Sequence, residues 1–379
     1  MTKRPFGFFV HHQGRGHAER VAAWVAALPI DRPVTIFCAR GDIFPALPAR
    51  VELRLIPSLF ECAESGPTPL ADAPTPDTLH CAPLGWPQIT SAMATMLGWM
   101  AEARPALFVV DVSAELAQLC RIASVPCVHV LQHGDRDDAG HIAAYQGCMG
   151  LLAPYAEALE QPERPGWLRA KTFHAPAIGA PVAVVGREEA RQRLGLNAAD
   201  EIILILSGAG GGGAPMAPLC LGARAFPGAR WIAIGPVAPE WHATQPGNLE
   251  LLGWTASPEL WIGAADIVIA GAGNTAVHAI LAAGRPFLVI PEWRYYDEQG
   301  RKAEALARAG AATMRQTWPG SPAAWAAALA QARALSPETQ QALAPPGAAM
   351  LAAAWLEDLA KTLWRPAAAR ILQPERITT

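Results

Sequence analysis

Charged side chains are scarce in this chain. Only 17% of the 379 residues are Asp, Glu, Lys or Arg, and the net charge is −3. Lys and Arg form no cluster that would attract a phosphate backbone, so nucleic acid is not an expected partner. Apolar residues make up 51% of the chain, which is ample material for buried cores, and this length favours two domains over one.

Cysteines are few, and long apolar runs do not occur. The seven cysteines are scattered and form no C-x-x-C pair of the kind used for zinc or redox chemistry, so reduced and mostly buried thiols are expected. No stretch reaches the ~18 uninterrupted apolar residues of a membrane span. The first residues contain no small-residue cleavage site for secretion. We therefore expect a cytoplasmic protein without a transmembrane segment.

Short apolar runs alternate with helix-compatible stretches along both halves of the chain. The runs are 6–10, 34–38, 51–56, 107–110 and 127–131 in the first half, and 202–206, 231–234, 249–252, 267–270 and 287–290 in the second. Short, wholly apolar runs of this kind suit parallel sheets buried on both faces. The pattern predicts an α/β protein with two doubly wound, Rossmann-like domains facing each other across a cleft.

The expected domain boundaries follow from glycine and proline. These residues interrupt both periodicities over 173–186, which divides an N-terminal domain, 1–177, from a C-terminal domain, 178–345. Residues 346–379 are expected to form a helix and tail that return towards the N-terminal domain. The proposed contact is an apolar stripe at i+4 spacing, formed by Leu351, Trp355, Leu359 and Leu363.

A proline-rich segment over 57–87 is predicted to be a long loop. Loops of this length inside compact domains are usually disordered or functional. Because this one would emerge at the binding edge of the sheet, a functional lid is one interpretation and a disordered loop is the other.

The turn after the first expected strand carries Gly14, Arg15, Gly16 and His17. A Gly-x-Gly turn between strand and helix lets the backbone approach a ligand closely, and it places His17 in the first turn of the helix. The positive end of the helix dipole disfavours a charged imidazole there, so a neutral histidine able to act as a general base is expected. The alternative is a histidine that only caps or packs at the helix start.

Asp111 ends the fourth expected strand. In the strand order 3-2-1-4-5, strands one and four are neighbours, and the crevice between their carboxyl ends is the ligand site. His17 and Asp111 are therefore predicted to face each other, because a carboxylate can fix the tautomer of a histidine base and stabilise the cation that it forms. The alternative for Asp111 is an N-cap of the helix over 113–123.

A polar turn follows the fifth expected strand and contains His133 and Asp135. Its spacing does not match a metal motif. These two side chains are predicted to contact the acceptor or the sugar, with a solvated loop as the alternative.

Two turns in the second half follow strands and precede helices. Their residues are Gly208, Gly210, Gly211 and Gly212 in the first turn, and Gly273, Asn274 and Thr275 in the second. Such turns expose backbone N–H groups and a helix dipole, which suit a diphosphate. No Gly-Lys-Ser/Thr follows, so neither is a Walker loop. Flexibility alone is the alternative for the glycine run, but the strand order predicts that the two turns face each other around one phosphorylated ligand.

These motifs resemble the GT-B glycosyltransferases, particularly the group containing the bacterial lipid-II-forming N-acetylglucosaminyltransferase and the UDP-glucuronosyltransferase-like enzymes. The most specific stretches are 253–254, 264–266, 271–286, 291–299 and 309–311. The resemblance implies a family 28-like donor domain in the C-terminal half and an acceptor-binding N-terminal domain. It implies donor contacts at Trp254, Gly273, Asn274, Thr275, Asp297 and Gln299.

Two features qualify this resemblance. A glutamate binds the ribose hydroxyls in many such enzymes, but Ala279 stands at its place, with His278 beside it as a further expected donor contact. The segment from Gly14 to Arg20 also fits the G-x-G-H-x-x-R signature of nucleotide-sugar hydrolases, in which water replaces the acceptor.

The expected activity is metal-independent, inverting transfer of a hexosyl or hexosaminyl group from a UDP- or dTDP-sugar to a small-molecule, lipid or peptide acceptor. His17, oriented by Asp111, would deprotonate the acceptor while backbone dipoles stabilise the departing diphosphate. Gly14, Arg15 and Gly16 are further expected contacts of the diphosphate or the acceptor. Neither a metal nor a cofactor is expected. The alternatives are a nucleotide-sugar hydrolase or 2-epimerase, and a non-catalytic nucleotide-sugar-binding protein.

Overall fold

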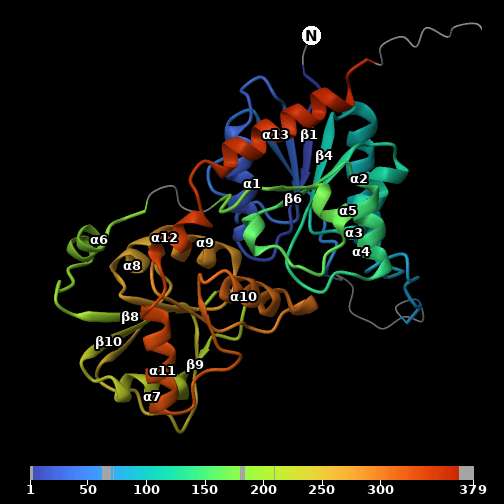
Figure 1. The fold of residues 1–379 in the computed structure, drawn as a ribbon. Coiled ribbons are helices and arrows are strands. Elements are labelled where there is room, and N and C mark those ends of the chain that lie inside the picture. Colours follow the sequence, from blue (N-terminus) through green and yellow to red (C-terminus); the bar gives the residue numbers. More distant parts are fainter. Residues whose placement is uncertain (1–2, 62–69, 71, 180–183, 209, 367–379) are drawn as a thin grey trace, which may run out of the picture.

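A computed structural model describes residues 3–61, 70, 72–179, 184–208 and 210–366. It contains two large sheets of parallel strands, one in each half of the chain (Figure 1). Parts of the expected proline-rich loop (62–69 and 71), of the join between domains (180–183) and of the C-terminal tail (367–379) lie outside the described residues.

The first half forms a seven-stranded sheet in the order β3-β2-β1-β4-β5-β6-β7. Its elements are β1 Phe6–Phe9, α1 Gly16–Ala27, β2 Val34–Cys38, β3 Val51–Leu55, α2 Pro87–Ala103, β4 Leu107–Asp111, α3 Ala114–Ile122, β5 Cys127–Val130, α4 Ala139–Gly147, β6 Gly150–Ala153, α5 Gly166–Ala170 and β7 Thr172–His174. Strands β1 and β4 pair in parallel, which confirms the predicted neighbours. The short strands β6 and β7 were not predicted.

The second half forms a six-stranded sheet in the order β12-β10-β8-β13-β14-β15. Its elements are α6 Arg187–Leu194, β8 Glu201–Leu206, β9 Ala214–Pro215, α7 Met216–Ala225, β10 Ala229–Ile234, β11 Val237–Ala238, β12 Leu249–Gly253, α8 Pro258–Ala264, β13 Ile267–Ala270, α9 Asn274–Ala283, β14 Phe287–Val289, α10 Glu298–Arg308, β15 Thr313–Met314, α11 Pro322–Arg333 and α12 Pro337–Ala342. Strands β8 and β13 are paired, so the two turns that follow them lie at one edge of the sheet. The predicted α/β class is confirmed.

The first sheet is buried on both faces because its central strands are apolar throughout. Phe8 and Val109 belong to the core on the side of α1, whereas Phe37 and Phe108 pack on the side of α2. Burial of one such side chain contributes ~1.5–3 kcal/mol. The packing is tight enough that a Cβ on Gly7 would lie 2.5 Å from the Phe108 ring.

The last helix, α13 Ala348–Leu363, packs back on α1 of the first half, as predicted (Figure 1). The predicted stripe was wrong in detail, because Leu351 is 56% exposed and its three partners pack only at the margin. The buried face includes Ala352, Leu356 and Ala360. Its alanines allow the helix to approach α1 closely around Leu356, whereas Trp355, Leu359 and Leu363 lie at the sides.

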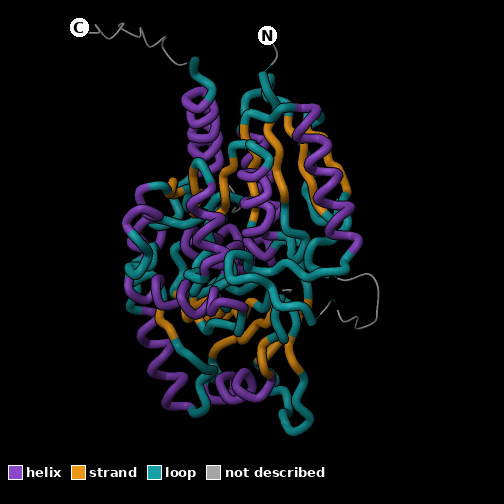
Figure 2. The backbone as a smooth tube through the Cα atoms, turned by 90° about the vertical axis from the view of Figure 1, so that its right-hand side faces the viewer, coloured by secondary structure: helices purple, strands orange, loops and turns teal. Residues whose placement is uncertain are grey.

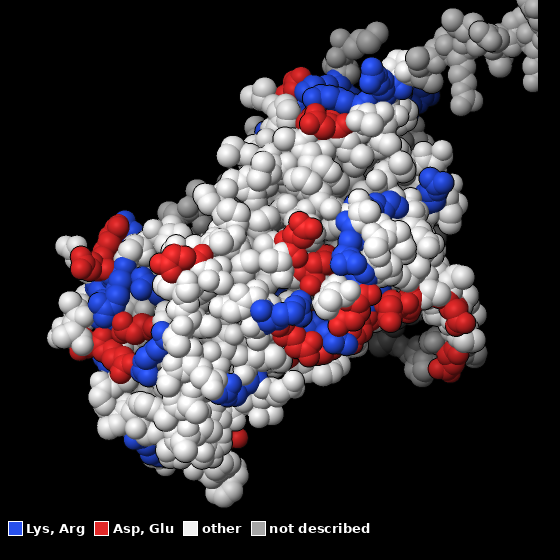
Figure 3. All heavy atoms as spheres, viewed as in Figure 1, with Lys and Arg blue, Asp and Glu red and all other residues white. Residues whose placement is uncertain are grey.

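The second view of the backbone shows loops gathering in the band where the two halves meet (Figure 2). Most of the face in Figure 3 is uncharged, and the acidic and basic side chains on it are interleaved.

The six described cysteines are free thiols, and five of them are buried. Among the described residues, no helix combines the length and apolarity needed to cross a membrane.

Candidate functional site

The carboxyl end of β4 and the first turn of α1 bring His17 and Asp111 into contact. The Nδ1 atom of His17 lies 2.7 Å from Oδ2 of Asp111, and Nη2 of Arg20 donates to Oδ1 of Asp111 over 2.6 Å. Asp111 does not cap the next helix, because the Ser113 side chain accepts the N–H of Leu116 there. The structure therefore places both predicted residues in one cluster and adds Arg20 to it.

The cluster is built around a buried carboxylate. Burial by itself would raise the pKa of Asp111, but the charges of Arg20 and His17 outweigh it and hold that pKa well below its ordinary range. An ionised Asp111 accepts the Nδ1 proton of His17, which leaves Nε2 with a free lone pair. Nη2 of Arg20 also lies 3.0 Å from Nδ1, but Nδ1 cannot accept that proton while it donates to Asp111. The His17 side chain is 25% exposed, so Nε2 can meet a ligand.

The turn before this cluster is compact. Gly14 has φ +77°, a conformation that favours glycine, and Arg15 is the exposed residue before α1. His11 lies beside His17, with ring centroids 5.3 Å apart. Burial and the charge of His17 lower the pKa of His11 to about 3, so His11 is neutral.

The start of α1 faces the start of α9 in the second half. A Cβ on Gly16 would lie 2.8 Å from Oγ1 of Thr275. Nδ2 of Asn274 donates to Oε1 of Gln132 over 3.1 Å, which joins the two halves. Helix α9 follows Gly273 without a side-chain cap from any described residue. Its N-terminal turn therefore lies close to the first turn of α1. We call this contact region between the two halves the junction.

Lys302 of α10 adds a positive charge at this junction. Its Nζ donates to Oδ1 of Asn274 over 2.6 Å, and the residue is 2% exposed. Burial lowers the pKa of Lys302 to about 8, against an opposing effect from Glu298. The amine therefore carries a proton at neutral pH. A helix N-terminus and a buried cation together make a site suited to an anion.

The glycine turn after β8 differs from what the sequence predicted. Strand β9 lies between this turn and α7 and pairs with β11. The N–H of Ala217, in the first turn of α7, donates over 2.5 Å to the carboxylate of Glu240. The prediction that the start of α7 adds its dipole to the glycine turn was therefore wrong, because a carboxylate of the protein already meets that helix start.

Glu292 lies between the two turns of the second half. A Cβ on Gly211 would lie 2.1 Å from a carboxylate oxygen of Glu292, and a Cβ on Gly271 would lie 3.5 Å from its Cγ. Nη2 of Arg294 donates to Oε2 of Glu292 over 2.7 Å and lies 3.3 Å from the place of a Cβ on Gly210. The two turns thus meet around Glu292, while Gly208, Gly212 and Gly273 have open space beside them.

Gln299 holds these turns in place. Its Oε1 accepts the N–H of Ala272 over 2.8 Å and the N–H of Glu292 over 3.0 Å, and the residue is buried. Asp297 is exposed beside it and has φ 50°. Trp254 follows Gly253 at the end of β12 and is 66% exposed. Asp297 and Trp254 are accessible, whereas the Gln299 carbonyl already accepts two backbone hydrogen bonds.

Three predicted residues at the junction are buried or paired. His133 is wholly buried with Nε2 2.8 Å from the Leu159 carbonyl oxygen, so its prediction as a ligand contact or a solvated residue was wrong. Asp135 instead pairs with Nε of Arg301 over 2.7 Å, across the two halves. His278 is 4% exposed beside Pro154, and burial lowers its pKa to about 3. Asp135 and His278 contact residues of the other half, whereas His133 contacts a residue 26 positions away in its own half, and local sequence reveals none of these contacts.

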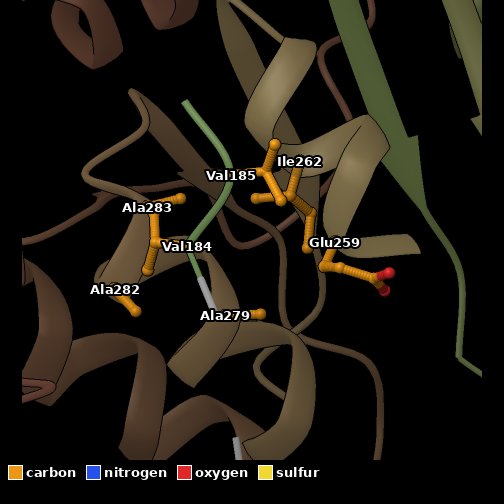
Figure 4. A pocket seen from close by; sticks show the side chains of 7 residues that line it. All are labelled: Val184, Val185, Glu259, Ile262, Ala279, Ala282 and Ala283. Carbon is orange, nitrogen blue, oxygen red and sulfur yellow. The ribbon is translucent and has the colours of Figure 1, made fainter. Parts of the chain in front are cut away.

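Ala279 packs within the second half. It lines a small apolar hollow with Val184, Val185, Ile262 and other residues (Figure 4). The hollow measures about 10 Å³, which is barely enough for one water molecule. The position assigned to ribose recognition by resemblance therefore lies beside α8 and the segment before α6, in its own half.

The sequence analysis did not assign roles to Arg20, Gln132 or Lys302. Arg20 belongs to the G-x-G-H-x-x-R signature, and Lys302 follows Gln299 by three positions on the same face of α10, so both had a local signal. Gln132 had none, because its contact joins turns that are distant in the chain.

Comparisons with known proteins agree with this architecture. Residues 239–334 match the model of the Glycosyltransferase family 28 C-terminal domain. The glycotransferase of kitacinnamycin has a TM-score of 0.62 at 16% identity, covering 95% of this chain and 100% of that one. The chain has the GT-B fold.

Two further structures share this GT-B fold. UGT71G1 of Medicago truncatula, solved with UDP-glucose, has a TM-score of 0.62 at 13% identity over 94% of this chain and 98% of its own. MurG of Acinetobacter baumannii has a TM-score of 0.57 at 13% identity over 94% and 99%. No curated protein matches this chain in sequence.

Proposed function

We propose that this GT-B protein transfers a hexosyl or hexosaminyl group from a UDP- or dTDP-sugar to an acceptor hydroxyl, with inversion and without a metal at the diphosphate. The observation that carries the proposal is the meeting of two complementary groups at one junction. The His17–Asp111 pair lies in the first half, and the start of α9 with Lys302 lies opposite in the second. A base and an anion site on opposite sides are what a direct displacement requires.

In the proposed reaction, Nε2 of His17 takes the proton of the acceptor hydroxyl as that oxygen attacks the anomeric carbon. Asp111 holds the other ring nitrogen and stabilises the imidazolium that results. General base action of this kind contributes ~10²–10⁴-fold in rate. Arg20 keeps Asp111 ionised and therefore acts as a positioning residue.

The bond from the anomeric carbon to the diphosphate breaks as the acceptor bond forms. The charge that develops on the departing oxygen is met by the N–H groups at the start of α9 and by the ammonium of Lys302. The exposed Trp254 stacks on the nucleobase, and Asp297 meets the sugar hydroxyls. The glycine turn around Gly211 lines the donor site, with Glu292 moving aside. The acceptor is a small molecule, a lipid or a peptide.

Thermal unfolding with a panel of UDP- and dTDP-sugars tests this proposal. A bound donor stabilises the folded state by RT ln(1 + [L]/Kd), which is ~2.7 kcal/mol at a hundred-fold excess over Kd. We expect stabilisation by at least one donor without added Mg²⁺ or Mn²⁺, and a smaller effect in Lys302→Met. Donor stabilisation that requires added Mg²⁺ or Mn²⁺ would contradict a metal-free donor site.

A nucleotide-sugar hydrolase on the same scaffold is the second candidate. The observation that favours it is the contact of Arg20, the last residue of the hydrolase-like signature, with Asp111. Water would then take the place of the acceptor hydroxyl at His17. Release of free sugar at the same rate with and without acceptors would favour the hydrolase, and donor consumption that requires an acceptor would favour the transferase.

A further inference from the structure

Three side chains with metal-binding atoms meet beside the junction, away from the His17 cluster. His80 precedes α2, and Asp138 and His141 lie at the start of α4. Each offers one ligand atom, and these atoms all lie within 4.8 Å of one another. The rings of His80 and His141 are 4.4 Å apart between centroids, and Oδ2 of Asp138 is 2.5 Å from Nδ1 of His141.

The three ligand atoms lie close enough to converge on one small divalent ion. Zinc binds imidazole nitrogen and carboxylate oxygen at ~2.0–2.2 Å in a tetrahedral arrangement, so its ligand atoms lie roughly 3.3–3.6 Å apart. The atoms of this cluster lie within 4.8 Å of one another, and Oδ2 of Asp138 lies only 2.5 Å from Nδ1 of His141, so the side chains of His80 and Asp138 rotate when an ion binds. Two imidazoles and one carboxylate are a donor set that suits zinc and similar transition metals.

One cation, Arg136, lies close to the cluster, with its guanidinium carbon 4.7 Å from the centre of the Tyr296 ring. The nearby cation Arg136 is paired with Glu298 over 2.8 Å, which offsets its charge.

The backbone around the three residues is fixed by other contacts. Oδ1 of Asp138 caps α4 by accepting the N–H of His141 over 3.1 Å. The N–H of His80 donates to Glu115 over 2.8 Å, and a Cβ on Gly140 would lie 2.5 Å from the backbone nitrogen of His80. The segment of His80 is therefore pressed against the start of α4, and only the side chains need to adjust.

A tyrosine of the second half touches the same cluster. The hydroxyl of Tyr296 lies 2.6 Å and 2.7 Å from the two ring nitrogens of His80. The carbonyl of Tyr296 accepts the N–H of Asp135 over 2.7 Å, and the residue has φ 61°. Asp297 and Gln299, which adjoin the proposed donor site, follow immediately in the chain. The three residues therefore border the Tyr296 loop, which belongs to the second half.

We propose that His80, Asp138 and His141 bind one divalent transition-metal ion, with zinc as the preferred ion. The ion ties the segment before α2 to α4 and leaves a coordination position on the side of the Tyr296 hydroxyl. Its role is to hold the Tyr296 loop against the first half, and it takes no part in transfer at the diphosphate. The site is independent of the proposed glycosyl transfer.

Zinc titration of the full-length protein, prepared without a polyhistidine tag, tests the site in competition with a chromophoric chelator. We expect one equivalent of zinc to bind, and we expect His80→Asn and His141→Asn each to weaken binding by about ten-fold or more, as loss of a ligand requires. Asp138→Asn is the sharpest variant, because asparagine retains the helix cap but removes the charge. Circular dichroism checks that each variant is folded.

Control variants locate the bound ion. His242→Asn, at an exposed position, should bind zinc as the parent does, and so should His12→Asn in the turn before α1. A parent protein that binds no stoichiometric zinc would overturn the proposal. Undiminished binding in folded His80→Asn and Asp138→Asn, or a loss found only in His12→Asn, would also overturn it.

Discussion

The first strand-to-helix turn of each half occupies the same place in its sheet, yet the two turns differ in what surrounds them. After β1, the turn leads directly into α1, and His17 meets Asp111 and faces the start of α9. After β8, the glycine turn is followed by β9, and Glu240 meets the start of α7. The anion-binding helix of the second half is therefore α9 and not α7.

This difference shows that topology limits where a ligand binds without assigning the chemistry to a particular turn. Both turns lie at carboxyl edges of parallel strands, where ligands of such sheets bind. In the first half that edge holds a base. In the second half the glycine turn contacts Glu292, and a positive site forms at the next turn with Lys302.

The largest expected effect separates catalysis in the first turn from donor binding in the second half. His17→Ala should reduce turnover by ~10²–10⁴-fold and leave the donor Kd unchanged, because His17 contributes the base and not the anion site. Steady-state kinetics and donor titration on one preparation measure both quantities. Asp111→Asn should show a smaller loss of turnover.

Gln13→Ala, an exposed change in the same turn, is the matched control and should retain both turnover and affinity. Normal turnover in His17→Ala would place the base elsewhere at the junction. Loss of donor binding in a folded His17→Ala protein would mean that the donor is not confined to the second half.

The second effect concerns the buried charges of the first turn. Arg20→Met should lower the free energy of unfolding by ~3–5 kcal/mol, because it leaves the carboxylate of Asp111 buried without its main partner. Urea denaturation measures this loss. Arg15→Met, at an exposed neighbour, should stay within ~0.5 kcal/mol of the parent. Equal stabilities of the two variants would show that the ion pair is not important for folding.

The third effect is the pH dependence of donor affinity, which tests the charge of Lys302. Because its pKa in the folded protein is about 8, donor affinity should fall as pH rises through 8, by at most about ten-fold per pH unit for the loss of one proton. Lys302→Met should bind more weakly and lose this pH dependence.

The stability of the free protein should follow the opposite trend. Between pH 8 and about 10.4 the unfolded chain keeps a proton on Lys302 that the folded chain has lost, so this residue makes stability rise with pH. Donor affinity that stays flat across pH 8 in the parent would argue against Lys302 as a diphosphate contact.

The smallest effect compares two positions of the glycine turn. Gly211→Val should lower stability by about 1 kcal/mol, because its side chain displaces the Glu292 carboxylate from Arg294. It should also weaken donor binding by blocking the approach of backbone to phosphate. Gly212→Val, with open space beside it, is the control for stability. Identical behaviour of the two variants in unfolding and donor titration would contradict a specific role for Gly211.

Local patterns were sufficient for the α/β class, for ten of the strands and for the meeting of His17 with Asp111. Apolar runs and strand-to-helix turns are short-range features, and the order of parallel strands follows a general rule. The same reasoning missed β6, β7 and β15, which have only two to four residues each. The predicted apolar stripe on α13 was also wrong. The size of the apolar side chains does not indicate which face of the helix can approach α1 most closely.

Contacts between distant segments decided the remaining features. The burial of His133, the capping of α7 by Glu240 and the meeting of Glu292 with Gly211 each join residues whose neighbours in the chain carry no sign of the partner. The same holds for His80, which reaches Asp138 and His141 only because the segment before α2 folds over α4. Pairing of this kind depends on how whole elements pack, so periodicity and turn chemistry cannot specify it.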